Sequence, residues 1–466
     1  MKTMQKGICA QAVRDFLTAL DDHSYRLHAL MIQQGEELLY ADAAAPYTLD
    51  TPHRLCSAAK SILSLNVLLA AQEGKLSFDD RVADFFPEME IEDPLLREMT
   101  VEDLLTMRTG QLDDPFIAML SDLDSDIITP FFQTPAVEKP GTTFRYNNTV
   151  PHIVYAVAER AMGVEIEAFQ NERLCRPLGA ALHAPTNPKG QYNPVITCAS
   201  ANSLMAFARL YLNEGKWNGE QLIDAELIRR AVALRADPGQ PEFASGYGYQ
   251  LWGTPFGGYR MDGGWGQYAF ILPEYNAVIV MLSDMTDSTY AFEAVREYLL
   301  PGLQRGAQEG QQFPAVHSIA PRGEAAPDAS LLEGEWLMED GRPLSLSMEE
   351  DEVRLQLGSE TFAIGLKDRF CSNPRHFLAG KRKGVDHTVY GFDPDEMLLS
   401  GAWTDAFTLE FVGKCFAEMG ECRYQLRFSS DGCTLSYPEA SVHGIASLED
   451  NLLMKGALLC KSRKSC

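Results

Sequence analysis

The order of sequence patterns along the chain predicts an α+β fold with an antiparallel sheet, followed by a smaller all-β domain. Short apolar or alternating runs of strand length occur near residue 30 and again between residues 247 and 283, and helical patterns fill the region between them. Strands and helices that are segregated in this way favour an α+β arrangement over repeated βαβ units. Beyond residue 331, strand-like runs recur with little helical periodicity, which is typical of a sandwich or a small barrel.

The first domain is expected to cover residues 1–303. A long helix is predicted from Ser57 to just before a glycine, and another begins with Pro151 and also ends before a glycine, as helices commonly do. Thr100 and Asp103 have the spacing of a capping box. Other helices are expected over residues 9–21, 203–214, 223–234 and 288–300, and strands over residues 26–33, 36–41, 247–252, 266–273 and 276–283.

The second domain is expected to span residues 331–466. Residues 304–330, which precede it, are rich in Gln, Gly, Ala and Pro, a composition typical of a linker. Strands are predicted in the runs LSLSM, EVRLQL, TFAIGL, TVYGF, FTLEFV and CRYQLRF. Gly334-Glu335-Trp336 resembles the G-x-W sequence that opens lipocalin-like barrels. A barrel-like all-β domain follows from these patterns.

The overall charge limits the classes of partner. The 466 residues include 40 basic and 65 acidic side chains, which gives a formal charge of −25. A strongly acidic protein repels phosphate backbones and anionic membranes, so nucleic-acid and membrane-surface roles are disfavoured. No apolar run suits a secretory signal or a membrane span, and the ten cysteines form no C-x-x-C pair. We expect a cytoplasmic protein with reduced thiols; its oligomeric state stays open.

Familiar cofactor and hydrolase signatures are missing from the sequence. It contains no P-loop, no H-E-x-x-H zinc sequence and no G-x-S-x-G nucleophile elbow. We therefore expect neither a cofactor nor a metal, and we look for a nucleophile of another type.

A serine and a lysine at the start of the long helix form the first candidate site. In Ser57-Ala58-Ala59-Lys60, the two polar side chains stand three residues apart and share one face of a helix. A serine hydroxyl is a poor nucleophile at neutral pH and needs a base, which a buried lysine amine can supply. The positive end of the helix also favours the negative charge that develops there. The same four residues arise by chance in many chains.

The second candidate is Tyr146-Asn147-Asn148, which lies on a turn-rich segment just before a helix. A tyrosine phenol in a cleft can relay protons between Ser57 and a leaving group. Asn148 can donate to a substrate carbonyl or hold Lys60. A capping turn with a half-buried tyrosine explains the same residues.

The third candidate is the glycine-rich sequence Asp262-Gly263-Gly264-Trp265-Gly266-Gln267. Glycines allow a substrate to lie close to an edge strand, where unpaired backbone N–H groups can bind an oxyanion. Trp265 could wall the acyl pocket or simply pack. A glycine hairpin is the alternative explanation.

The three candidates together resemble the serine β-lactamase superfamily, especially class C β-lactamases and their esterase relatives. That superfamily has S-x-x-K, Y-x-N and a glycine-containing strand in this order. Further segments resemble it in the same order, and together they cover roughly residues 20–300: HRLCSAAKSI, EGKLSFDDRVADFFPEM, LLTMRTG, PGTTFRYNN, RPLGA and GQYAFILPEYNAVIVMLSD. The resemblance implies an antiparallel sheet flanked by helices, with a helical subdomain.

The same resemblance implies a role for each site residue. Ser57 would attack a carbonyl to form an acyl-enzyme, and Lys60 and Tyr146 would share the base and acid roles. Asn148 would orient the substrate or Lys60. The backbone N–H groups of Ser57 and of a residue on the glycine strand, best matched by Gly264, would form the oxyanion hole.

The third candidate segment lacks a charge that the family pattern has. β-Lactamases and peptidoglycan peptidases carry K-T-G or H-x-G there, whereas this chain has Met261-Asp262-Gly263. The cation that helps to hold the carboxylate of β-lactams and D-Ala-D-Ala peptides is missing, unless Arg145 or Arg260 replaces it. We therefore expect an esterase or amidase for small neutral or cationic acyl substrates, among which D-amino-acid amides and oligoamides are possible.

Other outcomes of an acyl-enzyme stay open at this level. A covalent penicillin binder or sensor, in which deacylation is slow, uses the same first step, and so does an acyltransferase that passes the acyl group to an amine or alcohol.

Overall fold

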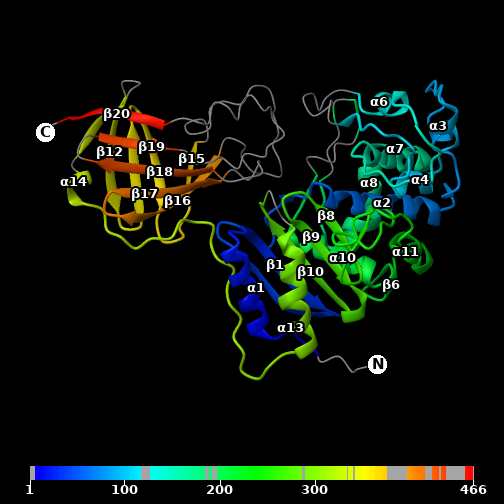
Figure 1. Ribbon diagram of the computed structural model, residues 1–466, viewed down its shortest axis with the longest axis horizontal. Coiled ribbons are helices and arrows are strands. Elements are labelled where there is room, and N and C mark those ends of the chain that lie inside the picture. Colours follow the sequence, from blue (N-terminus) through cyan, green and yellow to red (C-terminus); the bar gives the residue numbers. More distant parts are fainter. Residues whose placement is uncertain are drawn as a thin grey trace. The chain divides into compact units, whose positions relative to one another are not determined.

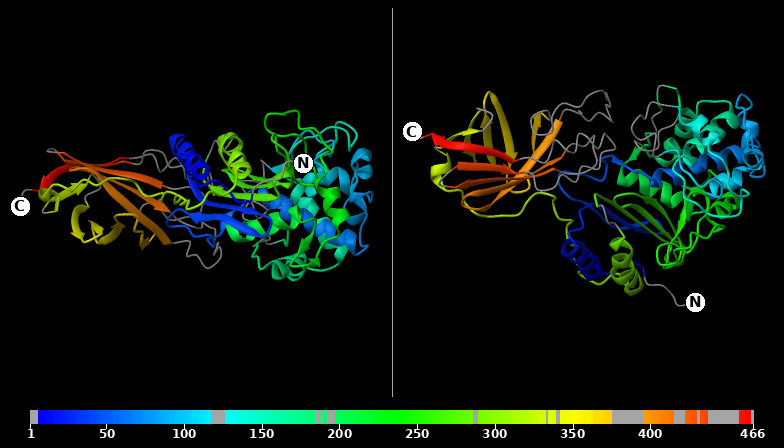
Figure 2. Two further views of the ribbon diagram at one scale, coloured as in Figure 1. Left: turned by 90° about the horizontal axis from the view of Figure 1, so that it is seen from below. Right: turned by 45° about the horizontal axis from the view of Figure 1, so that its top comes forward.

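The computed structural model describes residues 6–116, 126–183, 187, 189–191, 197–285, 289–332, 334–338, 342–374, 396–414, 422–429, 432–436 and 457–464. Contacts divide the chain into two compact units. One comprises Met1–Ala43 with Tyr47–Val316, and the other comprises Ala44–Pro46 with His317–Cys466. Figures 1 and 2 show a mixed α and β architecture in the first unit and a sheet in the second.

The first unit is built on a six-stranded antiparallel sheet. Its strands lie in the order β2-β1-β10-β9-β8-β7. The strands of this sheet are β1 (Leu27–Gln34), β2 (Glu37–Ala43), β7 (Trp252–Gly253), β8 (Tyr259–Gly263), β9 (Gln267–Leu272) and β10 (Ala277–Ser283). Two short ribbons pair β3 (His53–Arg54) with β4 (Cys198–Ala199) and β5 (Lys216–Trp217) with β6 (Glu220–Gln221).

Helices cover both faces of this sheet and form a helical subdomain beside it (Figure 1). The α-helices are α1 (Ala10–Asp22), α2 (Ala58–Gln72), α3 (Pro94–Glu98), α4 (Val101–Leu105), α6 (Ile128–Gln133), α7 (Val150–Met162), α8 (Ile166–Gln170), α9 (Arg176–Leu178), α10 (Ala201–Leu212), α11 (Ala225–Val232), α12 (Tyr290–Ala294) and α13 (Leu300–Arg305). The other helical turns are η1 (Val82–Phe85), η2 (Asn171–Cys175), η4 (Pro273–Tyr275) and η5 (Val295–Leu299).

One face of the sheet carries α1 and α13, which lie side by side in Figure 1. They meet at Gly302, where an added Cβ would come within 2.5 Å of the Ala12 Cβ. The other face carries α10 and α2. Its apolar side chains, such as Val278 and Val280, share one core with those of the helical subdomain. The site described below lies at the start of α2, where the sheet and the subdomain meet.

Helix α2 is the central element of that core. Every residue from Ala58 to Ala70 is buried, including Lys60 and Asn66. A helix that is buried around its whole circumference is enclosed by other elements on all sides. Its position is therefore fixed by packing against both the sheet and the subdomain.

Most of the expected elements of the first unit are confirmed. The predicted capping box is present, because the Asp103 N–H donates to Thr100 Oγ1 (3.2 Å) and the Thr100 N–H donates to Asp103 Oδ2 (3.0 Å). The long helix from Ser57 is α2, and the helix that begins at Pro151 is α7. The last helix extends further than expected, through α12, η5 and α13 to Arg305.

The prediction of a strand over residues 247–252 is wrong for most of this run. Only Trp252 of this run lies in β7. Gln250 has a left-handed backbone (φ 57°), and both its N–H and its side-chain amide donate to Leu105 O. These bonds bend the chain toward α4 instead of leaving it extended. The neighbouring strand β8 was not among the expected strands.

The first part of the segment expected to be a linker lies along the first unit. Gln311 Oε1 accepts from the Ala10 N–H (2.9 Å), and Tyr40 Oη donates to Pro314 O (2.9 Å). The boundary between the two units falls at Val316 and His317. The segment before this boundary is thus held by hydrogen bonds to α1 and β2.

The second unit is a barrel-like sheet of ten strands. Their order is β14-β13-β12-β11-β20-β19-β18-β17-β16-β15, and a further β14–β16 pairing at Gly365 and Ser400 nearly closes the sheet. The unit contains α14 (Ala329–Leu332), β11 (Glu335–Met338), β12 (Pro343–Glu349), β13 (Glu352–Leu357), β14 (Glu360–Gly365), β15 (Cys371–Pro374), β16 (Glu396–Asp405), β17 (Thr408–Lys414), β18 (Cys422–Ser429), β19 (Gly432–Ser436) and β20 (Ala457–Lys464). The expected run TVYGF lies outside the described residues.

Trp336 belongs to the core of this barrel, where its ring packs 4.8 Å from that of Phe428. The ring also folds back over Gly334, where an added Cβ would lie 2.5 Å from it. The glycine of the G-x-W sequence therefore makes room for the tryptophan.

Within the described part of the chain, no helix has the length and apolar character needed to cross a membrane.

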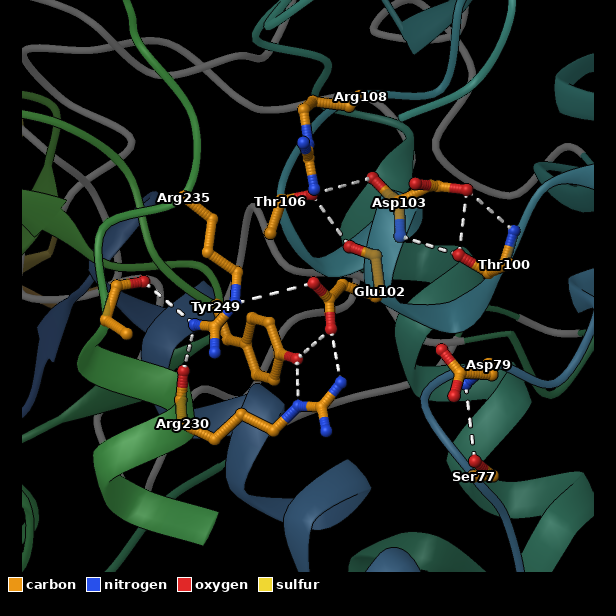
Figure 3. Close-up of polar contacts among 11 residues, drawn as sticks. Ser77, Asp79, Thr100, Glu102, Asp103, Thr106, Arg108, Arg230, Arg235 and Tyr249 are labelled. Carbon is orange, nitrogen blue, oxygen red and sulfur yellow. Dashed lines mark hydrogen bonds and ion pairs between the residues drawn. The ribbon is translucent and has the colours of Figure 1, made fainter. Parts of the chain in front are cut away.

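A polar network holds the bent segment beside α4, as Figure 3 shows. Glu102 accepts from Tyr249 Oη (2.7 Å) and from Arg230 Nη2 (2.5 Å), and Arg230 Nε also donates to Tyr249 Oη (2.8 Å). Arg235 lies 3.4 Å from the other oxygen of Glu102. Burial works against ionisation of Glu102, but the hydrogen bonds from Tyr249 and Arg230 outweigh it and lower its pKa below the usual value.

Replacing Glu102 by Gln is expected to lower the free energy of unfolding at pH 7 by about 1–2 kcal/mol, a typical value for hydrogen bonds to a partly exposed charged group. Because the pKa of Glu102 is lowered in the folded state, its contribution exists above the unfolded pKa and is lost as the pH falls through the folded pKa. The difference in unfolding free energy between the wild type and Glu102→Gln should therefore become smaller below about pH 4. Urea denaturation at several pH values measures it.

Glu226→Gln is the matched control, since Glu226 pairs with Arg229 on the exposed side of α11. It should change the unfolding free energy by less than about 0.5 kcal/mol. Equal effects of the two substitutions at pH 7 would contradict the role given to Glu102.

Candidate active site

A tight backbone turn presents Ser57 at the first turn of α2. Cys56 just before it has a left-handed backbone (φ 49°), which is rare for a residue with a side chain and concentrates at functional sites. The Ala58 N–H then donates to Leu55 O (3.0 Å) as the helix begins. Burial raises the pKa of the Cys56 thiol to about 12, so it stays protonated at neutral pH and does not compete with Ser57 as a nucleophile.

Lys60 lies one turn further along α2 and faces Ser57. Its Nζ donates to Ser57 Oγ at 2.7 Å and to Asn148 Oδ1 at 3.1 Å. Only 5% of the lysine is exposed. The spacing of three residues on a helix thus brings the serine and the lysine into contact, and Asn148 reaches the same amine from the start of α7.

Tyr146 forms an aromatic wall beside this amine. Lys60 Nζ lies 4.9 Å from the centre of its ring. Trp252 stacks on the same ring at 5.3 Å, and Tyr247 meets it edge-on at 6.5 Å. Burial raises the pKa of Tyr247 well above its usual value, so this neighbouring phenol stays protonated.

The two asparagines that follow Tyr146 have different tasks. Asn147 Oδ1 accepts from the Thr149 N–H (2.8 Å) and the Val150 N–H (3.2 Å), so Asn147 binds two backbone N–H groups at the start of α7. Asn148 instead bonds Lys60. Binding of the start of α7 and site formation therefore occur side by side in this turn.

The glycine strand lies directly against the start of α2. A Cβ at Gly263 would lie 2.1 Å from Leu55 O and 3.1 Å from the Ala58 nitrogen, so only a glycine permits this approach. Gly264 follows the last β8–β9 pair, is exposed, and would place a Cβ 4.0 Å from that of Cys56. The turn around it is tied to the end of β10, because Trp265 O accepts from Ser283 Oγ (2.9 Å).

The charges around the strand are already paired. Arg260 is fully buried on β8, donates from Nε to Asp262 Oδ2 (2.8 Å), and stacks on Phe243 and Phe292 at 4.5 Å. Arg145 forms an ion pair with Glu138. Burial raises the pKa of Asp262, although Arg260 and Lys60 act in the opposite direction. Each arginine that could have replaced the missing cation thus has its own carboxylate.

One polar residue of the site was not identified from the sequence. Asp114, in the loop after α4, accepts from the Asn148 N–H (2.6 Å) and from Asn148 Nδ2 (3.2 Å). It lies 34 positions before Asn148, and no sequence motif marks it. Trp252 was also missed, because it was read as part of a longer strand. Only the folded chain brings these two side chains to the site.

The described residues offer no metal site. Within them, no group of three or more His, Cys, Asp or Glu side chains is arranged to hold an ion. The groups gathered at the start of α2 are a hydroxyl, an amine, a phenol, an amide and backbone N–H groups, which is the equipment for nucleophilic chemistry on a carbonyl.

Comparison with solved structures identifies the same fold. A protein from Bacteroides dorei, described as a candidate beta-lactamase, matches with a TM-score of 0.53 and 22% identity over 62% of this chain and 99% of its own. An octameric penicillin-binding protein homologue from Pyrococcus abyssi matches with a TM-score of 0.51 and 16% identity over 92% of this chain and 98% of its own. SurE, solved with D-Leu, matches with a TM-score of 0.51 and 20% identity over 90% and 94% of the two chains.

These identities are low and establish the fold alone. No curated protein matches the sequence. The family model described as Beta-lactamase, however, matches residues 13–300, which contain the whole sheet of the first unit and all the site residues described above. The chain therefore belongs to the beta-lactamase family.

Proposed function

We propose that the protein is a serine hydrolase that cleaves ester or amide bonds of small substrates through an acyl-enzyme at Ser57. The contact of 2.7 Å between Lys60 Nζ and Ser57 Oγ, at the start of a buried helix, carries the proposal. A base at hydrogen-bond distance is what a serine hydroxyl needs in order to attack at neutral pH.

The reaction proceeds in two halves. Ser57 Oγ attacks the carbonyl carbon and gives up its proton, and the leaving group departs with a proton as the acyl-enzyme forms. Water then attacks the acyl-enzyme, and the proton returns to Ser57. We assign these proton transfers to Lys60 and Tyr146 together; the Lys60 amine lies 4.9 Å from the centre of the Tyr146 ring.

The negative charge on the carbonyl oxygen is stabilised at the start of α2. The Ser57 N–H belongs to the positive end of this helix, and the exposed Gly264 lies against the same turn. Two N–H groups that converge on one point form an oxyanion hole, and loss of one donor in such a site slows the reaction about 100- to 1,000-fold.

The preferred acyl groups are neutral or cationic. The site has Met261, which is buried and apolar, where relatives resembling it carry a cation. Arg145 and Arg260 are engaged by Glu138 and Asp262. A substrate carboxylate therefore meets no unpaired cation among these groups.

Ser57→Ala is expected to abolish hydrolysis of p-nitrophenyl butyrate, with a loss of at least about 1,000-fold in kcat/KM, because the nucleophile is removed. Ester turnover and labelling by a fluorophosphonate both measure this loss. Wild-type turnover should continue well beyond one equivalent of enzyme.

Ser61→Ala provides the matched control. Ser61 lies one turn further on the same helix, but its hydroxyl is buried and donates to Gln250 O (2.6 Å). This variant should still be labelled. Unchanged activity in Ser57→Ala would refute the proposal, and release of one equivalent followed by arrest in the wild type would indicate a covalent binder instead of a hydrolase.

The charge preference can be measured with two esters of equal acyl length. We expect kcat/KM for p-nitrophenyl butyrate to exceed that for p-nitrophenyl hemisuccinate by about tenfold or more, since one added charge repulsion or unmet ion pair costs over about 1 kcal/mol near a protein surface. Asp262→Asn should narrow this ratio, because it removes the acid and leaves Arg260 without a carboxylate.

The ratio does not depend on how much of the variant is folded, so it separates specificity from stability. Asp262→Asn is itself expected to lose about 3 kcal/mol of unfolding free energy, because Arg260 stays buried and unpaired. A wild type that hydrolyses the hemisuccinate as fast as the butyrate would contradict the assignment of substrate charge.

A further inference from the structure

The carboxylate of Asp114 is surrounded by hydrogen-bond donors beside the site. Its Oδ2 accepts from the backbone N–H (2.6 Å) and the side-chain Nδ2 (3.2 Å) of Asn148. Its Oδ1 accepts from Thr149 Oγ1 (2.7 Å) and from the Phe116 N–H (3.1 Å). The Asp114 carboxylate thus makes two contacts: one with Asn148, whose amide bonds Lys60, and one with Thr149 at the start of α7.

Asp114 decides which end of the Asn148 amide faces Lys60. An ionised carboxylate only accepts hydrogen bonds, so the NH2 group of Asn148 must point toward Asp114. The amide oxygen then points the other way, to Lys60 Nζ at 3.1 Å. A reversed amide would set its NH2 group against the lysine and leave two oxygens facing each other at Asp114.

The direction of this amide sets the direction of the lysine amine. A neutral amine has two N–H groups and one lone pair. In the structure Nζ donates to Ser57 Oγ at 2.7 Å; in the neutral amine, one N–H stays committed to Asn148 Oδ1 and the lone pair can turn to the Ser57 hydroxyl. In the attack, the Ser57 O–H bond breaks, an Nζ–H bond forms, and Lys60 becomes an ammonium that still donates to Asn148.

We propose that Asp114 is a positioning residue, which fixes the Asn148 amide and through it the Lys60 amine for the reaction of Ser57. This inference rests on the proposed acylation of Ser57. Asp114 touches no reacting atom, and its role is to keep the acceptor of Asn148 turned toward Lys60. The competing explanation is that Asp114 only fastens its loop to α7 through Thr149.

Asp114→Asn is the direct test, since it keeps the shape of the side chain but lets the Asn148 amide adopt either orientation. We expect the rate constant of fluorophosphonate labelling and the kcat for p-nitrophenyl butyrate to fall about 10- to 100-fold, with KM changed by less than about threefold. Asp113→Asn makes the same change of charge at the exposed neighbouring residue. This control should react like the wild type.

Thr149→Val separates positioning from fastening. It removes the bond from Thr149 Oγ1 to Asp114 Oδ1 and leaves the contacts with Asn148 in place. We expect its Tm to fall at least as far as that of Asp114→Asn, while its labelling rate stays within about threefold of the wild type. Equal loss of labelling in Thr149→Val and Asp114→Asn would overturn the proposal.

The pH profile supplies a readout that fastening alone would not move. Removing a carboxylate near the amine disfavours the ammonium form, so the acidic limb of kcat/KM should move to lower pH in Asp114→Asn and stay in place in Thr149→Val. An unmoved limb in Asp114→Asn would count against the proposal.

A double-mutant cycle tests whether Asp114 acts through Asn148. In an Asn148→Ala background, Asp114→Asn should cause little further loss of labelling rate. Full additivity would overturn the proposal. If Asp114→Asn does not fold, Asp114→Ser makes the same comparison, because its short hydroxyl cannot hold the NH2 group of Asn148.

The proposal and the function on which it rests fail in different ways. Labelling that survives in Ser57→Ala removes the proposed function. Labelling that requires Ser57 but proceeds at the wild-type rate in Asp114→Asn removes only the role of Asp114.

Discussion

The burial of Lys60 against Ser57 is the constraint on which the rest of this structure depends. A lysine in a helix whose residues 58–70 are all buried is costly unless its amine is hydrogen-bonded. Ser57 Oγ and Asn148 Oδ1 provide those bonds. Asn147, next to Asn148, holds the start of α7 by accepting from the Thr149 N–H, and β8 can approach α2 only because Gly263 has no side chain. The amine thus joins the start of α2 to the segment before α7, and β8 packs against the same turn of α2.

The arrangement of charge around this amine gives the site its character. Arg260 contacts the rings of Phe243 and Phe292 and is bonded to Asp262 of the same strand, which makes it a structural cation. The resemblance to serine β-lactamases leads us to expect a cation at the position of Met261, and this position is apolar and buried here. The family fold is therefore combined here with a different electrostatic environment, and this difference underlies the preference proposed for uncharged or cationic acyl groups.

The sequence predicted the parts of the site that depend on local spacing. Ser57 and Lys60 share a face because they are three residues apart on a helix, and the order of Tyr146, Asn148 and Gly263 indicated the family. Asp114 and Trp252 could not be found in this way, because their contacts depend on how loops fold onto the helices. The run that contains Trp252 looked like a strand, but Gln250 bonds to Leu105 and bends it. The catalytic roles of the site residues stay proposals.

The central claim is that Ser57 is the residue that becomes acylated. Trypsin releases this residue in the short peptide Leu55–Lys60, in which Cys56 and Ser57 are the only nucleophiles besides the terminal lysine. After fluorophosphonate treatment, tandem mass spectrometry of this peptide shows whether the adduct is on Cys56 or on Ser57. The account predicts a single adduct on Ser57. An adduct on Cys56 or on another peptide, with Ser57 unmodified, would contradict it.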